Sequence, residues 1–196
     1  MGGVRLCLDP HKPGALGGRF ALPAIVGPFD AVLCSHHHDD HAAWTPALGT
    51  TRIIDGPDQI GDVTVQVRAA FHDSHSGTRM GLVRMLSLTA DGLRIVHCGD
   101  LGAFDADDVA WLRGADVLLV PVGGTWTLDG AGAADLVRQV QPRWVVPMHA
   151  ADPRVDLALR PSEDFLAACD LPLTRAAVFD QQTPPAAGIL LLASPP

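Results

Sequence analysis

The sequence predicts a single α/β domain in which helices pack outside layered sheets. Of the 196 residues, 47% are hydrophobic, which is enough to build one core. Most apolar runs are short, rich in strand-forming residues and bounded by Gly, Pro or Asp. Single helical segments separate clusters of these runs, and no linker or repeat divides the chain, so we assign residues 1–196 to one domain.

The predicted strands differ in how far they are buried. Val63–Phe71 and Gly81–Leu88 partly alternate between apolar and polar residues, which indicates one buried face. The continuous apolar run in Val117–Pro121 indicates burial on both faces. Asp91-Gly92 favours a hairpin turn. In chain order, the expected strands are Val4–Leu8, Asp30–Cys34, Arg52–Ile54, Val63–Phe71, Gly81–Leu88, Leu93–His97, Val117–Pro121, Trp144–Pro147 and Ile189–Leu192.

Three helices are expected. Asp105–Arg113 begins with a capping aspartate, carries acids in its first turn and ends at glycine. Asp129–Gln141 has apolar residues on one face and is ended by proline. Ser162–Cys169 is the third, with two apolar residues as its contacts, and the proline-rich segment 183–187 is a loop.

Composition excludes several classes of function. The net charge of −8 argues against nucleic acid as a partner, which normally requires a clustered basic surface. No apolar run is long enough for a membrane span, and the N-terminus lacks the apolar core of a signal peptide. The four cysteines are scattered without a C-x-x-C pair, which is typical of reduced thiols. We therefore expect a cytoplasmic protein.

Histidines are concentrated in one window. The chain has nine histidines and no tyrosine, and four of the histidines lie within residues 36–41. His36, His38, Asp40 and His41 fit the pattern H-x-H-x-D-H directly after a predicted strand. A tight loop there can direct the first two side chains to one point and the Asp-His pair to another, as a two-metal site requires. The alternative is a solvated histidine-rich loop.

This window resembles the signature of the metallo-β-lactamase superfamily. Further segments follow in the order of that family's motifs, namely Phe71-His72-Asp73, Val96–Gly102, Pro121–Gly124 and Pro147-Met148-His149. The resemblance covers residues 4–170 and points to small metal-dependent hydrolases related to the ascorbate-6-phosphate lactonases. It implies an α/β fold of the αββα sandwich type.

Carried over position by position, the resemblance implies two divalent metal ions. The first ion is assigned to His36, His38 and His72, the second to Asp40, His41 and His149, with Asp100 bridging both. His75 is the alternative to His72, but the family's histidine follows a strand directly and precedes an acid, which favours His72. Imidazole and carboxylate ligands indicate Zn²⁺ foremost, with Mn²⁺, Fe²⁺ or Ni²⁺ as alternatives.

Several neighbours are candidates to orient a ligand or contact substrate. Asp9 matches an acid common in the family and is the best partner for a metal-bound histidine; a plain turn is the alternative. The weaker candidates, each with a surface or turn role as its alternative, are His37, Asp39, Asp73, His75, Arg79 and Thr125. Gly123-Gly124 permits close backbone approach. Cys98 is expected to be a buried thiol, with a metal-bound thiolate as the alternative.

The expected chemistry is hydrolysis of a small molecule. Metal ions lower the pKa of water from about 16 to about 7, so hydroxide held beside Asp40 and Asp100 is the expected nucleophile. The positive charge of two divalent ions exceeds the negative charge of the two carboxylates, which favours a substrate with an anionic group. The bond expected to be cleaved is a lactone, ester, thioester, amide or phosphoester. The alternatives are iron or manganese redox or lyase chemistry, and metal binding without catalysis.

The sequence departs from the family at its start. Family members usually begin with an additional strand, whereas only Met1-Gly2-Gly3 precede the first strand here. A missing edge strand exposes an edge that another subunit can cover, so we expect a homo-oligomer. The chain also lacks room for the inserted domain of the RNA-processing nucleases, which again argues against nucleic acid.

Overall fold

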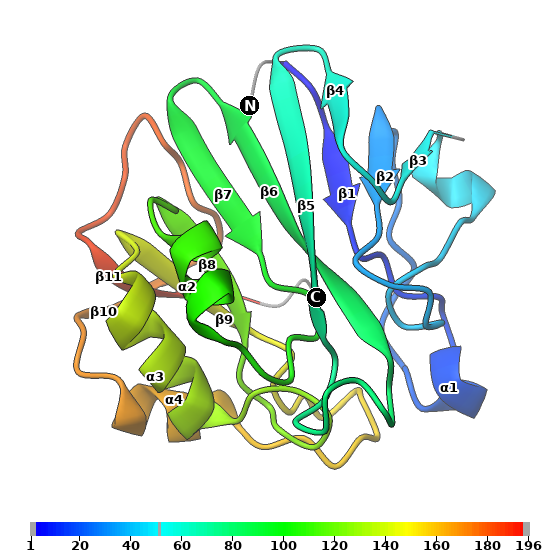
Figure 1. The fold of residues 1–196 in the computed structure, drawn as a ribbon. Coiled ribbons are helices and arrows are strands. Elements are labelled where there is room, and N and C mark those ends of the chain that lie inside the picture. Colours follow the sequence, from blue (N-terminus) through cyan, green and yellow to red (C-terminus); the bar gives the residue numbers. More distant parts are fainter. Residues whose placement is uncertain (1–2, 51, 194–196) are drawn as a thin grey trace.

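The computed structural model describes residues 3–50 and 52–193 (Figure 1). Residues 1, 2, 51 and 194–196, including the start of the segment expected to precede the first strand, lie outside the described residues. The strands are β1 (Leu6–Leu8), β2 (Ala31–Leu33), β3 (Ile53–Ile54), β4 (Asp58–Ile60), β5 (Val63–Phe71), β6 (Leu82–Ala90), β7 (Leu93–His97), β8 (Val117–Pro121), β9 (Trp144–Met148), β10 (Leu173–Ala176) and β11 (Gly188–Leu192). The helices are α1 (Ala15–Gly18), the 3-10 turn η1 (Pro46–Leu48), α2 (Ala106–Leu112), α3 (Gly130–Val140) and α4 (Ser162–Ala168).

The strands form two sheets. The small sheet has the order β1-β2-β3 and is parallel. The large, eight-stranded sheet has the order β10-β11-β9-β8-β7-β6-β5-β4. Its β4–β7 half is an antiparallel meander, whereas β7, β8, β9, β11 and β10 run parallel to their neighbours. The hairpin predicted at Asp91-Gly92 is confirmed, because both residues have positive φ, 54° and 74°, between β6 and β7.

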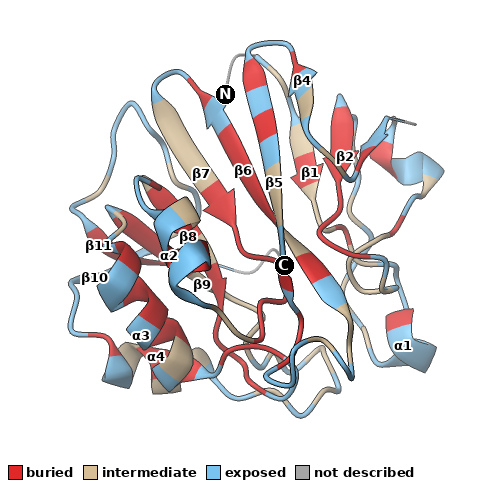
Figure 2. Cartoon of the chain, viewed as in Figure 1, coloured by how far each residue is buried: buried red, intermediate tan, exposed pale blue. Residues whose placement is uncertain are grey.

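The layers follow from side-chain alternation along the large sheet. On β6, Met85 packs in the cluster that includes residues of α2, α3 and α4, whereas Leu86 faces the small sheet with Leu33 of β2. The outer face of the small sheet is covered by loop residues and η1 around Val32. Helices and loops therefore lie outside two stacked sheets, and the buried residues follow the strands between them (Figure 2).

Most elements agree with the sequence expectation. Asp105 caps α2 by accepting the backbone N–H groups of Asp107 and Asp108, as its type predicts. The expectation lacked β4 and β10, which are short and lie at the two edges of the large sheet. It also lacked α1, whose Leu16 has a left-handed φ of 54°, so local helix propensity gave no signal.

The topology brings the loops after six strands to one edge. Strands β5, β7, β8 and β9 run in the same direction in the large sheet, and β1 and β2 end beside them. Loops at the carboxyl ends of such strands are where sites collect in α/β sheets. No helix among the described residues is long and apolar enough to cross a membrane.

Candidate metal centre

Asp100 lies at the middle of a histidine cluster. It follows β7, is only 4% exposed, and has four imidazole Nε2 atoms from three loops around its carboxylate. The distances are 3.8 Å to His36, 3.3 Å to His41, 3.4 Å to His72 and 3.4 Å to His149. Two ligands of one metal ion at about 2.0–2.1 Å each lie roughly 3.3 Å apart in tetrahedral geometry, so these separations suit shared ions.

The ligand atoms around Asp100 form two compact groups. Within each group, one ligand atom per residue lies within 4.8 Å of the others. One group is His36, His38 and His72, and another is Asp40, His41 and His149. These groups have the same membership as the two ligand sets that the resemblance implied. The structure therefore brings all seven predicted ligands together from the loops after β2, β5, β7 and β9.

Buried polar atoms of the cluster have no partner. Five atoms in it have no hydrogen bond within the described residues, namely His36 Nε2, Asp40 Oδ1, His72 Nε2, Asp100 Oδ1 and His149 Nδ1. Buried polar atoms are nearly always satisfied, because desolvation without a partner costs about 1–3 kcal/mol each. All five belong to predicted ligands, so the residues present fit a cation bound among them.

The surrounding hydrogen bonds direct lone pairs inward. Ser35 Oγ donates to Asp9 Oδ2 and lies 2.9 Å from His36 Nδ1, which must then donate to it. His41 Nδ1 lies 3.1 Å from Asp9 Oδ2, and His72 Nδ1 lies 3.3 Å from the carbonyl oxygen of Trp126. With Nδ1 as the donor of these bonds, each Nε2 faces the centre, where it can bind a metal once it carries no proton.

Burial and the neighbouring charges shift the pKa values of the clustered groups. Burial, together with the neighbouring His41, lowers the pKa of His36 to about 3, so this ring stays neutral. Although burial opposes ionisation, the histidines around Asp100 hold its pKa below the usual range. Burial likewise opposes a charge on His41, but Asp100 and Asp9 raise its pKa well above the usual value. A metal ion held by His41 Nε2 would displace that proton.

Asp9 orients ligands instead of pointing into the centre. Its carboxylate accepts the backbone N–H of Ser35 at 2.6 Å, the Ser35 hydroxyl and the His41 ring. Buried His97 lies behind it, with Nδ1 3.9 Å from Asp9 Oδ2. Although Asp9 also lies within reach of His36 and His41 as a possible ligand group, these donors already occupy it. It therefore connects to a histidine of each group, directly to His41 and through Ser35 to His36.

Backbone geometry at the centre is unusual. Asp9 and His149 have positive φ angles of 45° and 52°, which cost energy for residues with a Cβ. Gly123, after β8, lies so close to the His149 loop that a Cβ there would be 2.1 Å from the His149 carbonyl oxygen. This confirms the close backbone approach expected of Gly123-Gly124.

Several other sequence candidates make their contacts outside the cluster. His75 is exposed, so the structure places His72 and not His75 beside Asp100. Asp73 accepts four backbone N–H groups from residues 75–80, which lowers its pKa to about 2 against the effect of burial, and so it holds that loop. Exposed His37 faces Asp55 at 3.7 Å, outside the centre.

Three further candidates have structural surroundings. Arg79 is exposed, and its backbone N–H donates to Asp73. Asp39 is exposed, and its carbonyl accepts the N–H of Lys12. Cys98 is fully buried in the helix-side core, where burial raises its thiol pKa, so a thiol and not a ligand thiolate fits its surroundings.

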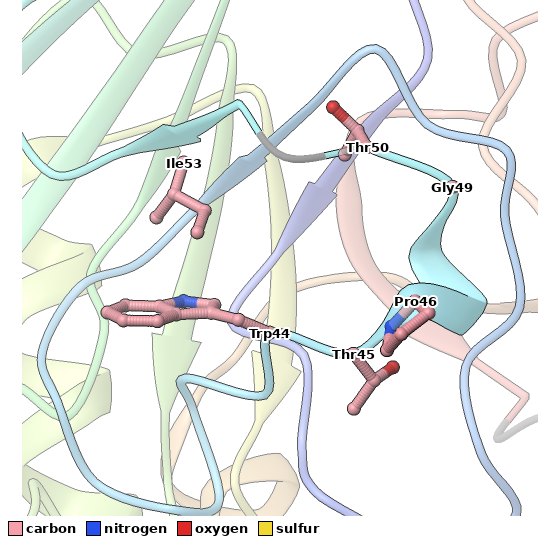
Figure 3. Close-up of a pocket in the computed structure, with 6 residues that line it drawn as sticks. All are labelled: Trp44, Thr45, Pro46, Gly49, Thr50 and Ile53. Atoms are coloured by element: carbon pink, nitrogen blue, oxygen red, sulfur yellow. The ribbon is translucent and has the colours of Figure 1, made fainter.

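A cavity of about 380 Å³ opens onto the centre. Five predicted ligands line it, together with Thr125, whose hydroxyl donates to the carbonyl of Ala158. The sequence analysis did not single out its other walls, which are formed by Leu16, Arg19, Met80, Trp126 and residues 157–159. A larger depression of about 750 Å³ lies beside Trp44 and Ile53 (Figure 3), but no ionisable side chain of the described residues lines it. Of these two, the smaller cavity is the one that contains predicted ligands.

Comparison with known proteins identifies the family. A family model described as a β-lactamase superfamily domain matches residues 1–149. The chain belongs to this superfamily. A UPF0173 metal-dependent hydrolase of Carboxydothermus hydrogenoformans is 30% identical over 75% of this chain and 77% of its own length. One from Pyrobaculum neutrophilum is 30% identical over 90% of this chain and 88% of its own length.

The fold agrees with that membership. A metallo-β-lactamase superfamily protein from Thermotoga maritima superposes with a TM-score of 0.76 and 25% identity, over 98% of this chain and 91% of the other. The sheets flanked by helices are thus the metallo-β-lactamase fold, as the sequence predicted. Together with these relatives, the His and Asp groups identify the chain as a metal-dependent hydrolase of the superfamily.

Proposed function

We propose that this metallo-β-lactamase-fold protein is a binuclear zinc hydrolase of small molecules. One observation carries the proposal: buried atoms without a partner occur in both ligand groups, in His36 and His72 of one and in Asp40 and His149 of the other, and in Asp100 itself. A single ion would leave one of those groups unsatisfied. Imidazole nitrogen and carboxylate oxygen, without a thiolate, suit Zn²⁺, although Mn²⁺, Fe²⁺ or Ni²⁺ accept the same ligands.

The chain's own residues prepare the centre for hydrolysis. His36, His38 and His72 would hold one ion, Asp40, His41 and His149 the other, and Asp100 both. Such ions supply a water of lowered pKa and an electrophile for the scissile carbonyl or phosphoryl oxygen. Asp9 and Ser35 keep ligand rings in the tautomer that binds metal. We assign Asp40 and Asp100 as the catalytic carboxylates, because they would hold the ions next to the nucleophilic water.

The cavity sets the substrate class. Its volume of about 380 Å³ fits a small molecule with a lactone, ester, thioester, amide or phosphoester bond. The net charge of −8 disfavours nucleic acid as a substrate. All four cysteines are unpaired and buried, which supports a reducing, cytoplasmic environment. We also keep the proposal of a homo-oligomer, since β1 and β10 are edge strands.

The first prediction tests the centre by substitution. His36→Ala and Asp100→Asn should each lower metal content and reduce turnover by at least about a thousandfold. The reason is that His36 Nε2 and the Asp100 carboxylate would bind the ions. Metal analysis of protein purified without added metal, and assays with ester, lactone, thioester and phosphoester substrates, measure this. The matched control is His37→Ala in the same loop, whose exposed ring faces Asp55.

Three results would contradict the proposal. Retained turnover in His36→Ala would show that the reaction does not depend on the metal centre. One equivalent of metal per chain would contradict the binuclear arrangement. Iron with visible absorption in the purified protein would contradict the zinc assignment and favour redox chemistry on the same ligands.

A further inference from the structure

The cavity at the centre is open and lined largely by apolar side chains. Leu16 of α1 and Trp126, in the turn after β8, are 39% and 44% exposed, although large apolar residues usually avoid water. Met80 and Leu157 also line the cavity. The walls therefore fit a substrate whose body is apolar beyond its reacting group.

One cation lies among these walls. Of the described residues that line the cavity, Arg19 is the single lysine or arginine. It is exposed, and its guanidinium makes no hydrogen bond or ion pair within the described part of the chain. In an acidic protein of net charge −8, an arginine left without a carboxylate partner in a substrate cavity is notable.

The backbone holds Arg19 in place despite this exposure. The N–H of Asp156 donates to the Arg19 carbonyl at 2.9 Å, and the N–H of Ala21 donates to the Arg154 carbonyl at 2.8 Å. Between them, Phe20 pairs with Val155 in an antiparallel bridge. The segment that carries Arg19 is thus fixed to the loop of residues 154–156, which leads directly into the cavity wall.

We propose that Arg19 selects substrates that carry a second, anionic group at the far end of an apolar body. This inference rests on the proposed function, which places the scissile bond at the metal centre. The planar guanidinium binds a carboxylate or phosphate through two parallel N–H bonds, whereas an ammonium acts as a point charge. Arg19 therefore determines specificity and takes no part in bond cleavage.

The test measures binding, so it does not depend on turnover. Calorimetry with zinc-loaded protein compares α,ω-dicarboxylates of four to eight carbons with monocarboxylates of equal length. A parallel series replaces the second carboxylate by a phosphonate. One oxyanion occupies the centre, so the ratio of the two dissociation constants reports the second group. We expect a ratio of about tenfold at one favoured length, reduced to about one in Arg19→Gln and intermediate in Arg19→Lys.

The control and outcomes separate this inference from the proposed function. Arg175→Gln removes the same charge from exposed β10 and should keep the ratio. A ratio near one in the wild type for both series, or a ratio unchanged by Arg19→Gln, would overturn the role of Arg19. Zinc titration and the turnover assays test the proposed function separately, because Arg19 is not a ligand and its variants should bind zinc normally.

Discussion

At the scale of single residues, the centre depends on what lies behind its ligands. Asp9 accepts hydrogen bonds from Ser35 and His41, and Ser35 in turn contacts the ring of His36. One carboxylate thus fixes a histidine in each ligand group. Asp9 holds this position with a left-handed backbone, which a residue with a Cβ adopts only when its surroundings compensate.

We predict that Asp9→Asn weakens metal binding without removing a ligand. An amide can still accept the Ser35 N–H, but it binds the imidazolium-like N–H of His41 less strongly than a carboxylate does. The dissociation constant for zinc should rise about 10- to 100-fold, as measured by competition with a chelating dye. Asp180→Asn on an exposed loop serves as the control. Unchanged zinc affinity in Asp9→Asn would contradict the positioning role.

At the scale of elements, two loops that carry ligands approach each other more closely than a side chain allows. Gly102, two residues after Asp100, donates its N–H to the Phe71 carbonyl at 2.8 Å. A Cβ on Gly102 would lie 2.5 Å from the Cα and N atoms of Asp73. Since His72 and Asp100 belong to these two loops, glycine at this position sets their separation.

Gly102→Ala should therefore separate the loops after β5 and β7. Overpacking of this kind costs about 1–3 kcal/mol in the free energy of unfolding, and zinc affinity should fall with it. Gly56→Ala is the matched control, because a Cβ there meets no atom within 4 Å. Chemical denaturation and zinc titration of both variants measure the effects. Equal stability of the two variants would show that the loops tolerate the added methyl group.

At the scale of the whole molecule, each of the two sheets has an edge strand that could pair with another copy of the chain. Among the described residues, β1 is an edge strand of the small sheet and β10 is an edge strand of the large sheet. Leu171, just before β10, is 39% exposed, and Leu173, the first residue of β10, is 44% exposed. Unpaired edges with nearby apolar side chains favour pairing with another copy of the chain.

We expect a mass of at least two protomers in solution. Light scattering coupled to size-exclusion chromatography at micromolar concentration measures it. Leu173→Lys places a charge on the β10 edge and distinguishes that edge from β1, since it should shift the mass only if β10 pairs. A monomeric wild-type mass would contradict the expectation of a homo-oligomer.

Local pattern was enough to predict much of this protein. Short alternating or continuous apolar runs mark these strands, so Val63–Phe71, Leu93–His97 and Val117–Pro121 were predicted with the bounds that the structure has. The edge strands β4 and β10 were not predicted, because exposed edges lack the continuous or alternating apolar pattern. The resemblance supplied the seven ligand positions, and spacing alone supported those of residues 36–41.

By itself, then, the sequence determined the fold class, the family and the residue types of the metal centre, because these depend on local periodicity and on motifs contiguous in the chain. Only the tertiary structure placed His72 and not His75 beside Asp100, bound Asp9 to both ligand groups, and put Arg19 on the cavity wall. Those arrangements arise where the loops after β1, β2, β5, β7 and β9 meet. Their physical basis is long-range strand pairing, which no window of neighbouring residues encodes.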